Sequence, residues 1–130
     1  MSIFRKIING EIPSYKVAED ERFYAFLDIH PVAQGHVLVV PKKETDYLFD
    51  LDDDTLSGMI LFSKRLAHAM KEVIACKRIA VTVIGLEVPH AHIHLIPINK
   101  ESDCSFNGPR KELTPQAFEE TARLIANAYV

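Results

Sequence analysis

Features that would place this chain in several common classes are absent from it. Only two cysteines occur among the 130 residues, Cys76 and Cys104, and they form neither a Cys-x-x-Cys pair nor a disulfide framework. No apolar run reaches the roughly 18 residues of a membrane span, and the first residues lack the apolar core of a signal peptide. The formal net charge of -3 disfavours a nucleic-acid-binding surface, which is normally basic. We therefore expect a cytoplasmic protein without nucleic-acid or membrane partners.

The length and the hydrophobic pattern predict a single α+β domain over residues 1–130. A capping serine, an aspartate cluster and a Thr-Pro pair mark the starts of three helices, at residues 2–10, 53–75 and 114 onward. Alternating or continuous apolar segments predict strands at residues 15–19, 23–27, 36–41, 78–84 and 90–98. The short turns between neighbouring strands favour an antiparallel sheet of about five strands.

The long predicted helix has more apolar surface than one packing contact requires. Its residues 59–62, Met-Ile-Leu-Phe, are apolar around the whole circumference of the helix. A second apolar surface fits either an interface with another copy of the chain or cover by another segment of the same chain. The sequence favours neither explanation.

Three histidines alternate with apolar residues in the segment His90-Ala91-His92-Ile93-His94-Leu95-Ile96. The period of two predicts a β-strand with all three imidazoles on one face and the intervening side chains in the core. At a rise of about 3.3 Å per residue, alternate side chains begin about 6.5 Å apart. Because imidazoles titrate near neutrality, such crowding on one face predicts a functional site rather than a structural role.

Imidazoles in this arrangement suit two kinds of chemistry. A metal-dependent hydrolase would use them as zinc ligands, with His36 as a further ligand, but carboxylates and thiols are poorly placed in the sequence to complete the site. A metal-independent enzyme would use the middle imidazole as a nucleophile toward phosphorus, provided that a backbone carbonyl holds its other nitrogen. The flanking histidines would then hold the phosphate oxygens and the leaving group. The residues favour the second reading, which needs no cofactor.

The triad segment, followed by Pro97, resembles the signature of the histidine-triad (HIT) family. Residues 3–13, 26–31 and 35–42 resemble three further segments of that family in the same order. The resemblance covers most of the chain and is nearest to the HINT-like nucleoside phosphoramidase branch. It implies a HIT-like fold, a homodimer paired through the long helix and an edge strand, and hydrolysis or transfer at the α-phosphate of nucleoside 5′-phosphoramidates or related nucleotide conjugates, with purine preferred.

The resemblance also implies roles for the histidines. His92 would be the nucleophile that forms a nucleotidyl-histidine, and His90 would position it. His94 would contact the phosphate and assist the leaving group, and His36 would lie at the edge of the same cluster. Together these four residues make up the expected catalytic site.

The resemblance implies that Asp28 accepts hydrogen bonds from the ribose hydroxyls, a task that suits a carboxylate. For Asp28 the alternative is a turn-initiating role before Pro31. Four apolar side chains would line the base pocket, with ordinary core packing as the alternative: Phe4, Ile7, Phe26 and Ile29.

The chain departs from the family pattern just before the triad. Leu86 stands where many relatives have a glutamine near the phosphate, and an upstream asparagine is missing. Thr82 or Glu87 could compensate, although a carboxylate near a phosphate repels it. Glu87 would therefore point away or contact a cationic leaving group such as an amine. The departure favours an alternative function, a catalytically weak nucleotide-binding or scaffold module.

A second departure concerns zinc. Some bacterial relatives bind structural zinc through an opening Cys-x-x-Cys and histidines. Here the matching opening is Ser2-Ile3-Phe4-Arg5, and Glu44-Thr45-Asp46 covers a position that is often histidine. The sequence therefore predicts no structural metal.

Overall fold

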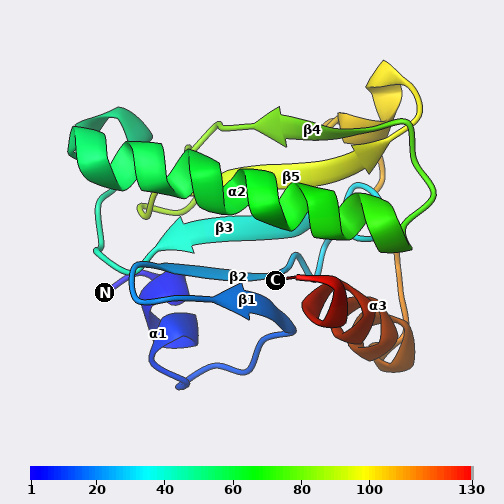
Figure 1. The fold of residues 1–130 in the computed structure, drawn as a ribbon, viewed down its shortest axis with the longest axis horizontal. Coiled ribbons are helices and arrows are strands. Elements are labelled where there is room, and N and C mark those ends of the chain that lie inside the picture. Colours follow the sequence, from blue (N-terminus) through cyan, green and yellow to red (C-terminus); the bar gives the residue numbers. More distant parts are fainter. Residues whose placement is uncertain (130) are drawn as a thin grey trace.

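The computed structural model describes residues 1–129 and shows the expected α+β architecture (Figure 1). Five strands form one antiparallel sheet in the order β1-β2-β3-β5-β4. The strands are β1 Lys16–Glu19, β2 Phe23–Leu27, β3 Val37–Pro41, β4 Arg78–Thr82 and β5 Ile93–Ile98. The α-helices are α1 Ile3–Ile8, α2 Asp53–Val73 and α3 Pro115–Ala128, and two short 3-10 helices cover Leu48–Asp50 and Glu101–Cys104.

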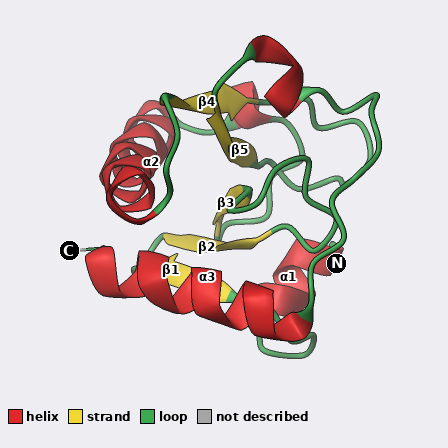
Figure 2. Ribbon diagram, turned by 90° about the vertical axis from the view of Figure 1, so that its right-hand side faces the viewer, coloured by secondary structure: helices red, strands yellow, loops and turns green. Residues whose placement is uncertain are grey.

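The helices lie on both sides of the sheet, as Figure 2 shows for α2 and α1. A large apolar core joins the sheet to α2 and α3, and Met59, Phe62 and Leu66 of α2 are fully buried in it. A smaller apolar cluster on the opposite face joins α1 to β2 and β3 through Phe4, Ile7, Tyr24, Phe26, Leu38 and Val40. The histidine segment lies beside this smaller cluster, since the His92 ring is 5.0 Å from the Phe4 ring between centroids.

The helix starts follow the capping signals in the sequence. The side chains of Ser2, Asp52 and Thr114 each accept a hydrogen bond from a backbone N–H in the first turn of their helix. Pro115 follows Thr114 at the first helical position, where a missing N–H costs nothing. The apolar residues 59–62 of α2 lie on two faces of the helix. Met59 and Phe62 are buried against the sheet, whereas Ile60 and Leu61 are about half exposed on the outer face.

The histidine segment differs from the expected strand. β5 begins at Ile93, so His90, Ala91 and His92 lie outside the ladder and the prediction of a strand from residue 90 was wrong. Pairing of β3 with β5 ends at Val39–Ile93. Pro41 has no N–H to donate to the partner strand, and its carbonyl oxygen accepts a hydrogen bond from the His90 ring instead. The alternation nevertheless holds, since Ala91, Ile93 and Leu95 are buried in the large core.

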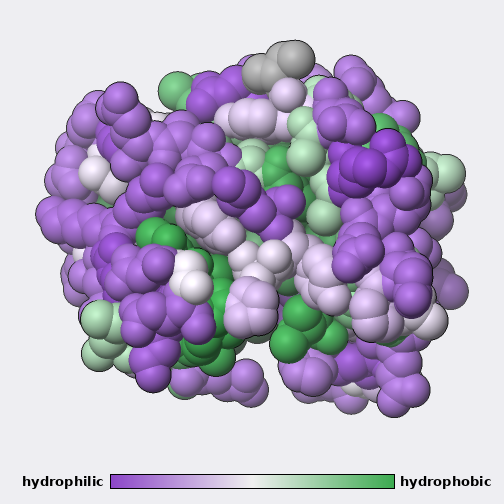
Figure 3. Space-filling model, turned by 90° about the horizontal axis from the view of Figure 1, so that it is seen from below, coloured by the Kyte–Doolittle hydropathy of each residue, from purple (hydrophilic) through white to green (hydrophobic). Residues whose placement is uncertain are grey.

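Two smaller features complete the fold. β4 ends at Thr82 rather than at residue 84. None of the helices described over residues 1–129 is long and apolar enough to cross a membrane. Figure 3, which views the molecule from below, shows hydrophobic patches between largely hydrophilic side chains.

Candidate active site

His92 presents a free ring nitrogen to solvent. Its Nδ1 lies 2.8 Å from the carbonyl oxygen of His90, and a carbonyl can only accept, so Nδ1 carries the proton. Nε2 has no hydrogen-bond partner. Among residues 1–129 the single fully buried polar side-chain atom without a partner is Ser63 Oγ, so His92 Nε2 is not sealed inside the protein. In its neutral form the imidazole therefore offers the lone pair of Nε2 to an electrophile.

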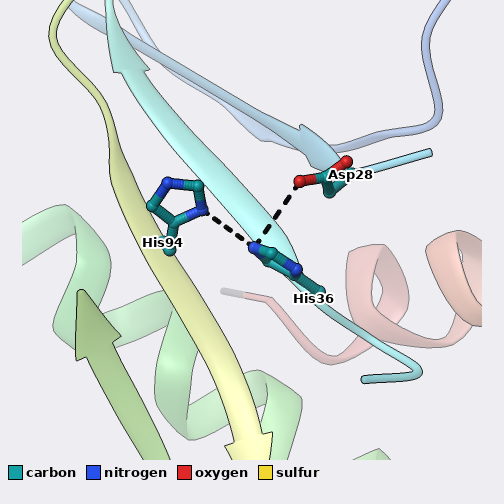
Figure 4. A group of neighbouring side chains, drawn as sticks. All are labelled: Asp28, His36 and His94. Carbon is teal, nitrogen blue, oxygen red and sulfur yellow. Dashed lines mark hydrogen bonds and ion pairs between the residues drawn. The ribbon is translucent and has the colours of Figure 1, made fainter. Parts of the chain in front are cut away.

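His94 is oriented by His36 (Figure 4). The backbone N–H of Val32 donates to His36 Nδ1 at 3.2 Å, so the proton of the neutral His36 ring is on Nε2. His36 Nε2 lies 2.9 Å from His94 Nδ1, which therefore accepts. The remaining nitrogen of His94, Nε2, must carry its proton. His94 thus presents an N–H donor two residues after His92, whose ring is 4.9 Å from its own between centroids.

Burial keeps both of these imidazoles neutral. It lowers the pKa of His36 from 6.5 to about 3, with the positive charge of Arg110 as the next cause. It likewise lowers the pKa of His94 to about 3, helped by the neighbouring His92 and His36 rings. At neutral pH His94 is therefore a hydrogen-bond donor through Nε2, and no imidazolium forms in the pair.

His90 is turned away from solvent and holds the segment in place. Its Nε2 donates to the carbonyl oxygen of Pro41 at 2.7 Å, and its Nδ1 accepts from Ser2 Oγ at 2.7 Å. Ser2 Oγ in turn caps α1 by accepting from the N–H of Arg5, and the Ser2 N–H donates to Glu44 Oε1 at 2.8 Å. Burial lowers the pKa of His90, which is fully buried. This chain of hydrogen bonds ties α1 and β3 to the carbonyl that orients His92.

Asp28 lies at the end of β2, next to the histidine pair. One of its carboxylate oxygens accepts from the N–H of His30 at 2.8 Å, as in an Asx turn, and the other lies 3.7 Å from His36 Nε2. The backbone N–H of Asp28 donates to the carbonyl of His36 at 2.9 Å and closes the loop. The side chain is partly accessible, so the carboxylate has capacity to accept further hydrogen bonds from a ligand.

Apolar side chains adjoin the imidazoles on the α1 side. The Phe4 ring meets the His92 ring edge-on with centroids 5.0 Å apart, and Phe26 packs on Phe4 at 5.6 Å. Ile7 belongs to the same buried cluster. Ile29, by contrast, is 58% exposed beside Asp28. Of the four side chains expected around a base, three therefore belong to one buried cluster, and Ile29 lies outside it.

The two residues named as possible compensation for the missing glutamine differ in position. Thr82 pairs with His94 between β4 and β5 and is partly buried, so it is brought to the site. Glu87 is exposed in the turn before the triad and makes no side-chain hydrogen bond or ion pair within residues 1–129. Leu86 beside it is 89% exposed. The structure thus brings Thr82, but not Glu87, to the histidines.

Neither possible metal site offers a free set of donors. Asp28, His36 and His94 place one donor atom each within 4.8 Å of one another, but His94 Nδ1 is directed at the N–H of His36 rather than at a shared point between the three residues. At the zinc position of some relatives, Ser2 and Arg5 stand in place of cysteines and His90 Nδ1 accepts from the serine. A hydroxyl and a guanidinium are poor replacements for thiolates, which zinc prefers. The site at Ser2 and Arg5 therefore does not fit zinc. The site at Asp28, His36 and His94 fits a metal ion only after the hydrogen bond between His36 and His94 is broken.

Two side chains of the site were not anticipated from the sequence. The ring of Phe106 lies 4.9 Å from that of His94 and 5.9 Å from that of His36, measured between centroids. The Arg110 guanidinium lies over the Phe106 ring at 5.1 Å. Both residues come from the polar segment 99–113, which has no periodic pattern to reveal an inward-facing aromatic ring. Ser2 was foreseen as a helix cap but not as the partner of His90.

Comparison with known proteins decides the family. A profile of the HIT domain matches residues 9–101, which include the whole histidine segment. The chain belongs to the HIT family. An adenosine 5′-monophosphoramidase, HNT1 of Saccharomyces cerevisiae, is 44% identical over 100 residues, which are 76% of this chain and 63% of the yeast protein. An uncharacterized HIT-like protein of Borreliella burgdorferi is 36% identical over 95% of both chains.

Solved structures of HIT proteins share the fold. A hypothetical histidine triad nucleotide-binding protein of Sulfolobus tokodaii has a TM-score of 0.85 and 32% identity, covering 97% of this chain and 90% of its own. A zinc-bound histidine triad family protein of Mycobacterium smegmatis has a TM-score of 0.84 and 31% identity, covering 98% and 91%. These likenesses confirm the HIT-like fold expected from the sequence.

Proposed function

We propose that this HIT protein hydrolyses nucleoside 5′-phosphoramidates, or related purine nucleotide conjugates, at the α-phosphate through a covalent nucleotidyl-His92 intermediate. The observation that carries the proposal is the state of His92, whose Nδ1–H is held by a backbone carbonyl while Nε2 is free. The yeast relative HNT1 is an adenosine 5′-monophosphoramidase, which supports the same substrate class.

The proposed reaction has two steps. His92 Nε2 attacks the α-phosphorus, the bond from phosphorus to the leaving group breaks, and the leaving group keeps the electron pair and takes a proton from solvent water; the water that attacks in the second step returns one proton to solvent. Water then attacks the phosphorus of the nucleotidyl-histidine, the P–N bond breaks, and the nucleoside monophosphate is released with His92 restored. The Nε2–H of His94 stabilises the phosphoryl oxygens in both steps as a fixed hydrogen-bond donor.

The remaining groups bind the nucleotide. Asp28 accepts the ribose hydroxyls with its accessible carboxylate oxygen, and Thr82 contributes a hydroxyl on the far side of His94. The base lies against Phe4 and the exposed side chain of Ile29. Glu87 is exposed in the turn before the triad, so it meets only a leaving group that extends outward from the histidines, such as an amine.

The test is turnover of adenosine 5′-phosphoramidate, measured as release of AMP, by the wild type and by His92→Asn. Wild-type turnover that falls by at least about 10³-fold in the variant, with AMP still bound, is the expected result, since removal of a nucleophile leaves only binding and electrostatic effects. Retained turnover in His92→Asn would remove the assignment. Binding of AMP without any wild-type turnover would instead favour the nucleotide-binding or scaffold module.

We further propose that the reaction needs no metal ion. His36 Nε2 and His94 Nδ1 are committed to each other, so a metal ion would have to displace the hydrogen bond that orients His94. Excess chelator is expected to leave the rate unchanged. Loss of activity on chelation, with recovery on adding zinc, would favour the metal-dependent hydrolase.

Two exposed apolar strips support a homodimer. β4 is an edge strand with Val81 59% exposed, and the neighbouring α2 exposes Ile60 and Leu61 at 48% and 54%. An open edge with apolar neighbours pairs readily with a second copy. Light scattering should give twice the mass of 14.7 kDa for the wild type and a monomer for Leu61→Asp. A wild-type monomer at working concentrations would refute the dimer.

A further inference from the structure

The segment that follows the family domain reaches back onto the triad. The HIT profile ends at residue 101, and residues 105–111 lie beyond it. Two hydrogen bonds attach this segment to the loop that carries Asp28. Arg110 donates through a guanidinium nitrogen to the carbonyl of His30 at 2.8 Å, and the Lys111 N–H donates to the carbonyl of Pro31 at 2.8 Å. The segment is therefore fixed against the site rather than free in solvent.

Phe106 is the inward-facing side chain of this segment. Its ring meets the ring of His94 at 4.9 Å and 67° and the ring of His36 at 5.9 Å and 75°. Four rings thus stand edge to face in one row, Phe4, His92, His94 and Phe106, with successive centroids 5.0, 4.9 and 4.9 Å apart. Phe4 limits the row at one end and Phe106 at the other. The two imidazoles are therefore packed between two phenylalanine rings.

We propose that Phe106 is a positioning residue that packs on His94 and keeps the His94 Nε2–H directed at the phosphate. The same ring excludes water from the hydrogen bond between His36 and His94. This inference rests on the proposed function, because it gives His94 the role of a fixed donor. The Phe106 ring neighbours both imidazoles of the pair at once. Arg110 holds the outer face of the ring through a cation–π contact.

The charges around the pair are consistent with this role. The groups that face His36 and His94 are the carboxylate of Asp28 after β2, the imidazole of His92 before β5 and the guanidinium of Arg110 in the 105–111 segment. Desolvation is the largest cause of the lowered pKa of both imidazoles. Phe106 supplies part of this desolvation, so removing its ring hydrates the pair and raises both pKa values toward 6.5.

Phe106→Ala is the test variant and Phe106→Leu keeps an apolar side chain in its place. Phe49→Ala is the matched control, because it removes a ring that is 69% exposed on another part of the surface. We expect kcat for adenosine 5′-phosphoramidate to fall at least about tenfold in Phe106→Ala with KM changed by less than about threefold, since misaligning a catalytic group costs turnover rather than binding. Phe106→Leu should lose less, and Phe49→Ala nothing.

A second measurement does not depend on turnover. At pH 6 the imidazole ¹⁵N spectra of the wild type should show that His36 and His94 are neutral and hold fixed tautomers. In Phe106→Ala the same signals should change with pH around 6.5, as those of a histidine in water do. Unchanged kcat together with unchanged imidazole signals in Phe106→Ala would overturn the inference. If the wild type releases no AMP, the proposed function fails, and the spectra alone decide whether Phe106 positions the pair.

Discussion

We expect acid to destabilise the folded protein because the buried imidazoles of His36 and His94 bind protons more readily in the unfolded chain. Above about pH 6.5 the His36 and His94 rings are neutral in both the folded and the unfolded chain. As the pH falls, the unfolded chain binds a proton at each ring near 6.5, whereas the folded protein resists until about pH 3. Stability is therefore complete above the unfolded pKa and is lost progressively as the pH falls from about 6.5 toward 3.

The size of this loss follows from the two pKa values. At about pH 5, each ring lies roughly 1.5 pH units below its unfolded pKa, which costs about 2 kcal/mol of unfolding free energy per ring, or about 4 kcal/mol for the pair. Small domains have about 5–15 kcal/mol in total, so the loss is a large share. The lowered pKa of the buried His90 acts in the same direction.

Urea unfolding at about pH 7.5 and about pH 5, at fixed protein concentration, measures the difference. The matched control is His68→Asn, since His68 is exposed on α2 and its ring is in water in both states. His36→Asn combined with His94→Asn should remove most of the pH dependence, whereas the control should retain it. A wild-type loss below about 1 kcal/mol, or an equal loss in the double variant, would refute the reasoning.

Two further predictions follow from contacts at the edge of the site. Asp28→Asn should raise KM for adenosine 5′-phosphoramidate about tenfold and change kcat by less than about threefold, because a ribose contact is made equally in the ground and transition states. KM for a substrate without ribose hydroxyls should not change in this variant. An equal rise in KM for both substrates would contradict the assignment of Asp28 to the ribose. Ser2→Ala should lower the unfolding free energy by about 1–2 kcal/mol, since it removes both the α1 cap and the hydrogen bond to His90. Chemical denaturation measures this, with Ser57→Ala on the exposed side of α2 as the control and no difference between the two as the refuting result.

Local signals predicted most of the fold. The cap at Thr114 and the proline after it are short-range features, and the structure starts α3 there. The alternation around Ile93 and Leu95 depends only on which face of the sheet is buried, and both side chains lie in the core. The extension of the strand back to His90 failed because Pro41, far away in sequence, ends the pairing on the neighbouring strand.

The site was predicted unevenly for the same reason. The alternation of histidines with apolar residues identified the three imidazoles of the triad, and the family resemblance identified Asp28. The state of each ring could not be read from spacing, because it is set by partners such as the Val32 N–H and Ser2 Oγ. Phe106 lies in an irregular segment, where no pattern distinguishes an aromatic ring that packs on the site from one that faces solvent.

The most direct test of the central claim is intact-mass measurement of the protein quenched during turnover of adenosine 5′-phosphoramidate. The account predicts a transient adduct of one adenylyl group, located on His92 after proteolysis and absent from His92→Asn. Release of AMP at the full rate with no adduct at any time, or an adduct on a different residue, would contradict it.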